Sequence, residues 1–177
     1  MTDSELQQKR LIAAAIDIAI AVGIMVVFWV GAFVFVLLAG SNSGSGVLPY
    51  VGRVLGFLGA LLSLGYILGR DVLAGGNSIG KKTQGIRVVT TGGAPITFVD
   101  SAKRNAFFAI GSILGLVSAT LGLIPCLGDA VNCLLLPLRL IGLVVGLVVA
   151  VIEIVKITQD PEGIRLGDSF AGTRVVR

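Results

Sequence analysis

Apolar residues dominate four long stretches of the chain: residues 11–39, 51–68, 106–124 and 134–157. Each stretch approaches or exceeds the roughly 20 helical residues that cross the hydrocarbon core of a bilayer. Such stretches predict transmembrane helices, because a helix satisfies its own backbone hydrogen bonds where no water is present. The pattern therefore predicts an all-α membrane protein, with a bundle of four transmembrane helices in a single domain over residues 1–177.

Composition supports a location in the membrane. Hydrophobic residues make up 55% of the 177 residues and charged residues 14%, whereas soluble domains carry roughly a quarter charged residues. A chain this apolar cannot present a solvated surface on every side. The first stretch is also much longer than the apolar core of a cleavable signal peptide, which predicts a permanent span.

Lysine and arginine lie mostly on one side of the predicted bundle. The connections at 40–50 and 125–133 contain neither residue type. By the positive-inside rule, we expect both termini, a loop of residues 69–105 and a tail of residues 158–177 to lie on the cytoplasmic side of the cell membrane. We attribute the net charge of +4 to this bias and to attraction to anionic lipid, and we expect no nucleic-acid partner. The basic residues on the cytoplasmic side are Lys9, Arg10, Arg70, Lys81, Lys82, Arg87, Lys103, Arg104, Lys156, Arg165, Arg174 and Arg177.

The cytoplasmic loop contains two short motifs. GGNSIGKK at 75–82 approaches the phosphate-binding loop of nucleotide hydrolases, but Lys82 stands where that motif needs a magnesium-binding hydroxyl, so we expect no nucleotide site. GIRVVTT at 85–91 has the β-branched character of a strand, the Gly-Gly pair after it offers a tight turn, and APITFV at 94–99 can return as a second strand. The sequence predicts a short β-hairpin in this loop.

Small residues predict how the helices pack. A spacing of four residues places two glycines on one face of a helix and lets the backbone of a neighbouring helix approach closely. We therefore expect a compact bundle with close contacts at the pairs Gly52 and Gly56, Gly65 and Gly69, Gly111 and Gly115, and Gly142 and Gly146.

Two carboxylates lie within the apolar stretches. A charge at that depth costs at least about 2.5 kcal/mol on insertion, so each carboxylate needs a partner, water or a proton. Asp17 has no opposite charge within one helical turn, and Arg10 lies about two turns away on the same face, so we expect its partner from another element. Lys156 follows Glu153 by three residues, and for Glu153 we prefer a local ion pair to a direct functional role. Asp17 is therefore the first candidate for a functional group.

Metal and enzyme chemistry find little support in the sequence. The chain has no histidine, and its two cysteines, Cys126 and Cys133, cannot complete a four-ligand zinc site. These cysteines lie in the short outer connection, where they either form a disulfide or act as small apolar residues at a helix hairpin. We expect no metal, no cofactor and no enzymatic activity.

Four segments resemble the RDD family of small membrane proteins, which is named for one arginine and two aspartates. RLIAAAID at 10–17 resembles the opening of the family, and GGNSIGKKTQGIRVVTTGG at 75–93 resembles its glycine- and lysine-rich segment. KRN at 103–105 is similar to the start of its next span, and RLGDSFAGTRVV at 165–176 is similar to its closing segment. The resemblance covers nearly the whole chain.

The resemblance carries the family's residues over to particular positions. It assigns the arginine to Arg10, the first aspartate to Asp17 and the second aspartate to Asp168, with Asp71 as the weaker candidate. It also implies that the glycine-rich segment turns near the membrane surface, where basic side chains meet lipid phosphate. The candidates for that contact are Lys81, Lys82 and Arg87.

The resemblance suggests transport of an ion or a small solute. In this hypothesis Asp17 binds a cation or a proton during cation–proton exchange, Glu153 helps to form an inward-facing vestibule, and a homo-oligomer supplies the room that four helices lack. The alternative is a non-catalytic assembly or scaffold protein of the membrane. There, Arg10, Asp17 and Asp168 form a structural latch, and an ion pair between Arg10 and Asp168 docks the tail beneath the first span.

Overall fold

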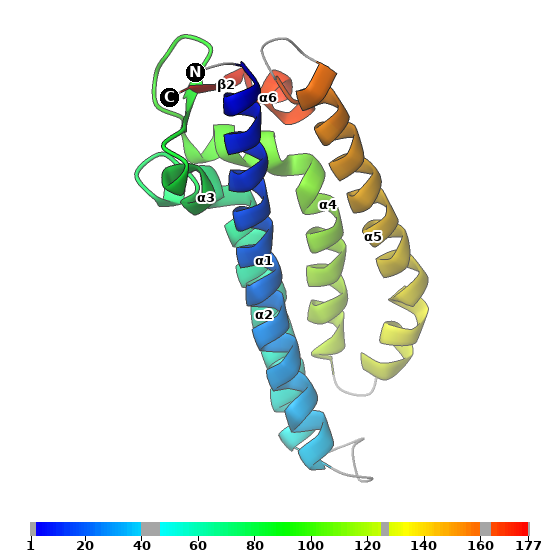
Figure 1. Cartoon of the computed structure of the whole chain (residues 1–177). Helices are drawn as coiled ribbons and strands as arrows, with labels where there is room; N and C mark the ends of the chain where they lie inside the picture. Colours follow the sequence, from blue (N-terminus) through cyan, green and yellow to red (C-terminus); the bar gives the residue numbers. More distant parts are fainter. Residues whose placement is uncertain (1–2, 40–46, 125–127, 160–163, 177) are drawn as a thin grey trace.

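Four long helices run side by side along one axis (Figure 1). The computed structural model describes residues 3–39, 47–124, 128–159 and 164–176. The principal contacts form a row, in which the first helix packs on the second, the second on the third and the third on the fourth. In chain order the four are α1 (Asp3–Ala39), α2 (Val47–Leu73), α4 (Phe98–Gly122) and α5 (Gly128–Gln159).

The short elements and both ends of the chain gather where the four long helices end on one side of the molecule (Figure 1). We call this region the cap, and it includes the adjoining ends of the four long helices. Its own elements are α3 (Ile79–Thr83), β1 (Arg87–Thr90), α6 (Leu166–Ala171) and β2 (Thr173–Val176).

Three helices are long and apolar enough to cross a membrane: α1, α2 and α4, with mean hydropathies of 2.8, 1.8 and 1.6. Large apolar side chains such as Trp29 and Phe33 are exposed along them, as expected of residues that face lipid. In α5, the apolar segment found among the described residues is Leu140–Glu153, and Pro137 lies within the helix. Three of the four predicted spans therefore meet the criteria, and the fourth stays a prediction.

The predicted β-hairpin is wrong in its second strand. The turn after β1 forms, with Gly93 at a φ of +84°. However, β1 pairs along its length with antiparallel β2 from the tail, where Val88 lies opposite Val175. On the other edge of β1 a single bridge joins Val89 to Pro95, and proline has no N–H to extend a ladder. The chain enters α4 soon after this bridge. Because β1 pairs with β2, the sheet joins the cytoplasmic loop to the tail.

A small apolar core supports this sheet. Val88 and Val175 pack with Ile86 and Ile96 against Ala13 of α1, and all five are buried. The sheet and the α2–α4 connection are thereby fixed on the first turns of α1. The cap has its own core in addition to the contacts between the long helices.

Close contacts between α1 and α2 occur at one glycine of an expected pair and at another glycine seven residues away. A Cβ at Gly52 would lie 2.9 Å from the carbonyl oxygen of Ala32, and one at Gly59 would lie 2.5 Å from Cβ of Phe28. A Cβ at Gly56 would meet no described atom within 4 Å. Seven residues return to the same face after two turns, so Gly52 and Gly59 form the close contact and the Gly52–Gly56 pairing is wrong.

The contact between α4 and α5 follows the same rule. A Cβ at Gly111 would lie 3.3 Å from the carbonyl oxygen of Gly142 on the facing helix. Inclined helices come closest at one point, so one glycine of each pair makes the contact. A Cβ at the expected second glycines would meet no described atom within 4 Å: Gly115 and Gly146.

Candidate functional site

Charged side chains are buried together inside the cap. Among the described residues, four carboxylates and four basic groups are at most 9% exposed. They come from the long helices, α3 and the tail, so folding brings together charges that are far apart in the sequence. The carboxylates are Asp17, Asp71, Glu153 and Asp168, and the basic groups are Arg70, Lys81, Arg104 and Arg165.

Asp17 of α1 is held by neutral donors from two other elements. The hydroxyl of Tyr66 in α2 donates to Asp17 Oδ1 at 3.3 Å, and the backbone N–H of Gly80 in α3 donates to the same oxygen at 2.8 Å. A Cβ at Gly80 would collide with the carbonyl oxygen of Ala13. Glycine at position 80 therefore lets α3 reach the carboxylate.

Asp71, at the end of α2, is the centre of the larger network and is fully buried. Its Oδ1 forms an ion pair with Lys81 Nζ, and its Oδ2 accepts from Asn105 Nδ2 at 3.0 Å. The side-chain amide oxygen Oδ1 of Asn105 accepts from Arg70 Nε and Nη2 at 3.1 and 2.7 Å. Arg104 Nε lies 3.7 Å from Asp71 Oδ2. Asp71 thus joins α2, α3 and α4.

Asp168 fixes the tail to α4. Its Oδ1 lies 2.7 Å from Arg104 Nε and 3.0 Å from Arg165 Nε. The backbone N–H of Gly167 donates to Glu153 Oε1 at 3.0 Å, and a Cβ at Gly167 would collide with the carbonyl oxygen of Arg104. The start of α6 is therefore inserted between α4 and α5.

Two expected ion pairs give way to other contacts. Arg10 Nη2 donates to the carbonyl oxygen of Val175 in β2 at 3.0 Å, while Asp168 is paired with the guanidinium groups described above. Glu153 points inward to α6 and Lys156 is exposed, so the local pair expected for Glu153 is wrong. The partner of Glu153 is therefore set by the packing of α6 against α5 and not by proximity in the sequence.

Burial and neighbouring charges shift the pKa values of the cap groups that lie outside the spans. Burial lowers the pKa of Lys81 to about 7, although the Asp71 carboxylate opposes that fall. Burial raises the pKa of Asp168, but Arg104 and Arg165 outweigh it and hold the pKa below its ordinary value. For Arg165 burial lowers the pKa, but Asp168 and Asp71 outweigh it and raise the pKa. Asp168 and Arg165 are thus charged, and Lys81 titrates near neutral pH.

A small cavity of about 40 Å³ lies among these groups. In the part of the chain that the structure describes, its wall carries five basic side chains and two carboxylates, so N–H donors outnumber acceptors. Within the described residues, no group of three or more His, Cys, Asp or Glu side chains is arranged to hold a metal ion. The wall is formed by Arg10, Ala14, Asp17, Arg70, Lys81, Arg104, Arg165, Asp168 and Val175.

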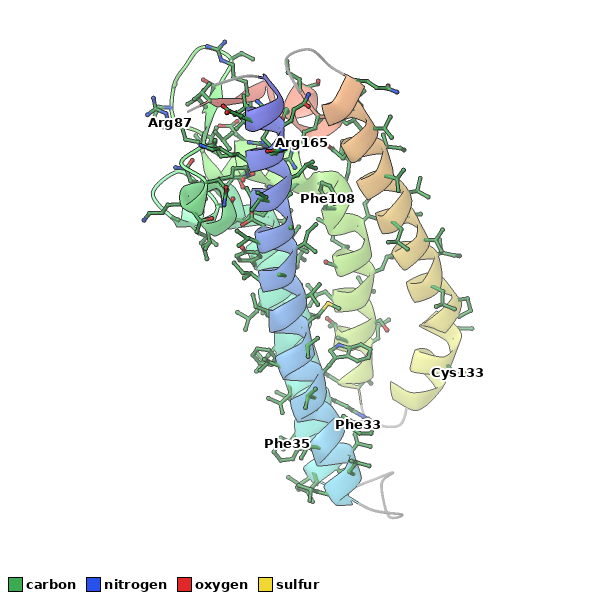
Figure 2. The ribbon with its side chains drawn as sticks, in the orientation of Figure 1. Phe33, Phe35, Arg87, Phe108, Cys133 and Arg165 are labelled. Carbon is green, nitrogen blue, oxygen red and sulfur yellow. The ribbon has the colours of Figure 1, made fainter. Side chains whose placement is uncertain are left out.

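The candidates for lipid contact separate into two kinds. Lys81 is buried against Asp71, so the structure does not place it at the surface. Lys82 and Arg87 are exposed, and Figure 2 shows Arg87 on the outer side of the cap. Their contact with lipid phosphate stays a prediction.

The structure describes one of the two cysteines. Cys133 is exposed near the start of α5 and forms no disulfide with a described residue. Cys126 lies outside the described residues. A disulfide between them therefore stays a prediction.

Several residues of the site were not among the sequence candidates. Arg70 was counted only as an indicator of topology, and Tyr66 was not singled out. Arg104, Asn105 and Arg165 lay in segments that resemble the family, but they were given no role in the site. A signal for most of them is present, because RD at 70–71, KRN at 103–105 and RLGD at 165–168 each combine polar groups beside a helix end. Sequence alone does not say that these groups meet.

Comparison with known proteins yields one match. A model of the RDD family matches residues 7–172, which confirms the resemblance and includes Arg10, Asp17, Asp71 and Asp168. No curated protein and no solved structure matches the chain.

Proposed function

Because the chain belongs to the RDD family of membrane proteins, we propose that it moves a small ion or polar solute across the membrane. The observation that carries this proposal is the cavity of about 40 Å³ beside Asp17, at the end of the spanning helices. One water needs about 10–15 Å³ of such space, so the cavity suits an ion or a small solute. Its wall combines groups from α1, α2, α3, α4 and the tail, as expected of a binding site.

Asp17 is the intramembrane group of this proposal. A carboxylate on a spanning helix is costly, and such groups mark ion and proton pathways. The donors to Asp17 among the described residues are the Tyr66 hydroxyl and the Gly80 backbone N–H, and both are neutral. The Asp17 carboxylate therefore interacts electrostatically with any ion or solute that occupies the cavity.

The wall of the cavity guides the choice of solute. Five basic groups against two carboxylates repel a bare metal cation and attract an anion or a neutral polar solute. This argument weighs against the simple cation–proton exchange expected from the sequence. Proton coupling remains part of the proposal through Lys81, because burial lowers its pKa to about 7.

Assembly and orientation complete the proposal. The row of four helices leaves large apolar side chains exposed, among them Trp29 and Phe33 of α1, and a second copy of the chain would cover part of that surface and enclose a path. We place the cap on the cytoplasmic side, where the positive-inside rule puts its basic residues.

The test is flux in sealed vesicles that contain the purified protein. We expect accumulation of chloride, phosphate or a small solute by the wild type and a loss of at least about tenfold in Asp17→Asn. Glu5→Gln is the matched control, because Glu5 is an exposed carboxylate on the same helix. Wild-type flux in Asp17→Asn, or no flux of any tested solute by folded protein, contradicts the proposal.

A second candidate, an assembly protein closed by a latch, is favoured by the docking of the tail. β2 pairs with β1, Arg10 donates to Val175, and Asp168 binds Arg104. The test exchanges the charges of Arg104 and Asp168. Recovery of folded oligomer by the double exchange, combined with no flux by the wild type, would replace the transporter by the assembly protein.

A further inference from the structure

Two terminal guanidinium nitrogens buried in the cap, Nη1 of Arg104 and Nη2 of Arg165, have no hydrogen-bond partner among the described residues. Nε of Arg104 makes no hydrogen bond there either, although it lies within ion-pair distance of Asp168 Oδ1. Arg104 is 1% exposed and Arg165 is 9% exposed, so bulk water does not satisfy these donors. A buried charged donor without a partner is costly, and native structures rarely leave one without a reason.

The two arginines lie next to each other because they share one acceptor. Each places Nε near Asp168 Oδ1, at 2.7 and 3.0 Å. Both side chains also form part of the cavity wall. Asp168 therefore engages one nitrogen of each guanidinium group and leaves other donors of the same pair for an occupant of the cavity.

The carboxylates of the cap do not neutralise this wall. Among the described residues, only Asp17 and Asp168 belong to it, against five basic groups. Asp71 lies behind the wall, where Lys81 and Asn105 engage its two oxygens. The wall thus has an excess of positive charge and of N–H donors.

We propose that the cavity binds a phosphate-type oxyanion through Arg104 Nη1 and Arg165 Nη2, with Lys81 adding positive charge. Planar guanidinium groups match the oxygen spacing of such anions, and hydrogen bonds between charged groups are the strong ones. The volume of about 40 Å³ admits one phosphate group and excludes a nucleotide. This inference deepens the proposed function and rests on the same cavity, but it concerns binding and holds whether or not the solute is moved.

The phosphate group has two sources, inorganic phosphate in solution or the headgroup of a phospholipid. Both present the same oxygens to the two arginines. A lipid source would make the cavity a structural lipid site, whereas free phosphate would make it a solute site.

The first experiment is calorimetric titration of delipidated, full-length protein in detergent with inorganic phosphate. We expect saturable binding that sulfate competes for and chloride does not. Arg104→Lys and Arg165→Lys keep the charge but lose the fork of donors, and we expect phosphate affinity to fall about tenfold or more in each. Arg174→Gln removes an exposed arginine of β2 outside the wall and should bind as the wild type does.

Asp17→Asn gives a test in the opposite direction, which misfolding cannot imitate. Asparagine keeps an acceptor for Tyr66 and Gly80 but removes a negative charge from the wall. We expect phosphate affinity to rise about fivefold from the loss of this repulsion. An unchanged or lower affinity in folded Asp17→Asn contradicts a phosphate site in this cavity.

Mass spectrometry of the intact protein, before and after delipidation, distinguishes the two sources. A retained phospholipid that competes with inorganic phosphate, and that is lost in Arg165→Lys, identifies the headgroup as the occupant. Binding of inorganic phosphate alone identifies the free anion. The inference is overturned if the wild type binds neither, or if both lysine variants bind as the wild type does. Binding without flux overturns only the transport proposal, and flux without binding overturns only this inference.

Discussion

The bundle and the cap are held together by opposite means. In the bundle, helices approach at glycines, as Gly59 does against Phe28, and large apolar side chains face outward. In the cap, carboxylates and basic groups are buried side by side, as around Asp71 and Asp168. Lipid provides no hydrophobic force between helices, so the bundle depends on close packing, whereas each buried charge in the cap depends on its partners. Stability should therefore respond far more to a lost charge in the cap than to a crowded contact in the bundle.

The largest effect is expected at Asp71. Asp71→Asn leaves Lys81 buried without its carboxylate and leaves Arg104 with Asp168 alone, and breaking a buried pair in this way costs about 3–5 kcal/mol. Equilibrium unfolding in mixed detergent micelles measures the loss. The control Glu5→Gln removes an exposed carboxylate from α1 and should stay within about 0.5 kcal/mol of the wild type. Equal losses in the two variants would remove the contrast between cap and surface.

The next largest effect is expected where the cap meets α1. In Gly80→Ala the new methyl group would collide with the backbone of Ala13, which has no side-chain rotation to relieve it. We expect a loss of about 2–3 kcal/mol in the free energy of unfolding, together with a weaker hydrogen bond to Asp17. Gly56→Ala, in open space on α2, is the matched control and should be neutral. A neutral result for Gly80→Ala would mean that α3 is not held against α1.

A smaller effect is expected inside the bundle. Gly59→Ala places a methyl group against Phe28, and α1 and α2 can separate slightly in lipid to relieve the contact. We therefore expect a loss of about 1–2 kcal/mol, again measured against Gly56→Ala. If Gly59→Ala were more damaging than Gly80→Ala, the bundle rather than the cap would be the more tightly packed region.

The smallest effect concerns pH. Lys81 has a folded pKa of about 7, lowered from 10.5 by burial, so the unfolded chain binds more protons between these values and the contribution of Lys81 to stability rises with pH. Its charged neighbours in the cap are Asp71, Arg70, Arg104 and Arg165. From pH 7 to 8 we expect the wild type to gain about 1 kcal/mol relative to Lys81→Met in thermal or denaturant unfolding. Parallel pH profiles for the two proteins would show that Lys81 keeps its ordinary pKa.

The sequence located the long helices well, but not their ends. Span 106–124 becomes a helix that begins at Phe98, because Thr97 and Asp100 form a capping box before the apolar stretch starts. Hydropathy identifies the segments that face lipid, but it does not identify a first helical turn that is made of polar residues. In this chain those polar turns bring Ser101, Arg104 and Asn105 into the cap.

The candidate site was predicted only in part. Asp17 and Asp168 were identified through the RDD pattern, and Asp71 was its weaker candidate. The structure makes Asp71 the centre of the network and adds Arg104 and Arg165. A basic residue near a helix end can set the orientation of the helix in the membrane or can pair with a buried carboxylate. A count of charges does not distinguish these two roles.

By itself the sequence determined the membrane character, the long helices and the family, because hydropathy and local motifs are properties of consecutive residues. Only the tertiary structure decided that β1 pairs with the tail and that charges from distant segments enclose a cavity. Pairing across such distances depends on which groups lose water together, and a charge is stabilised by whichever partner the packing of helices brings to it.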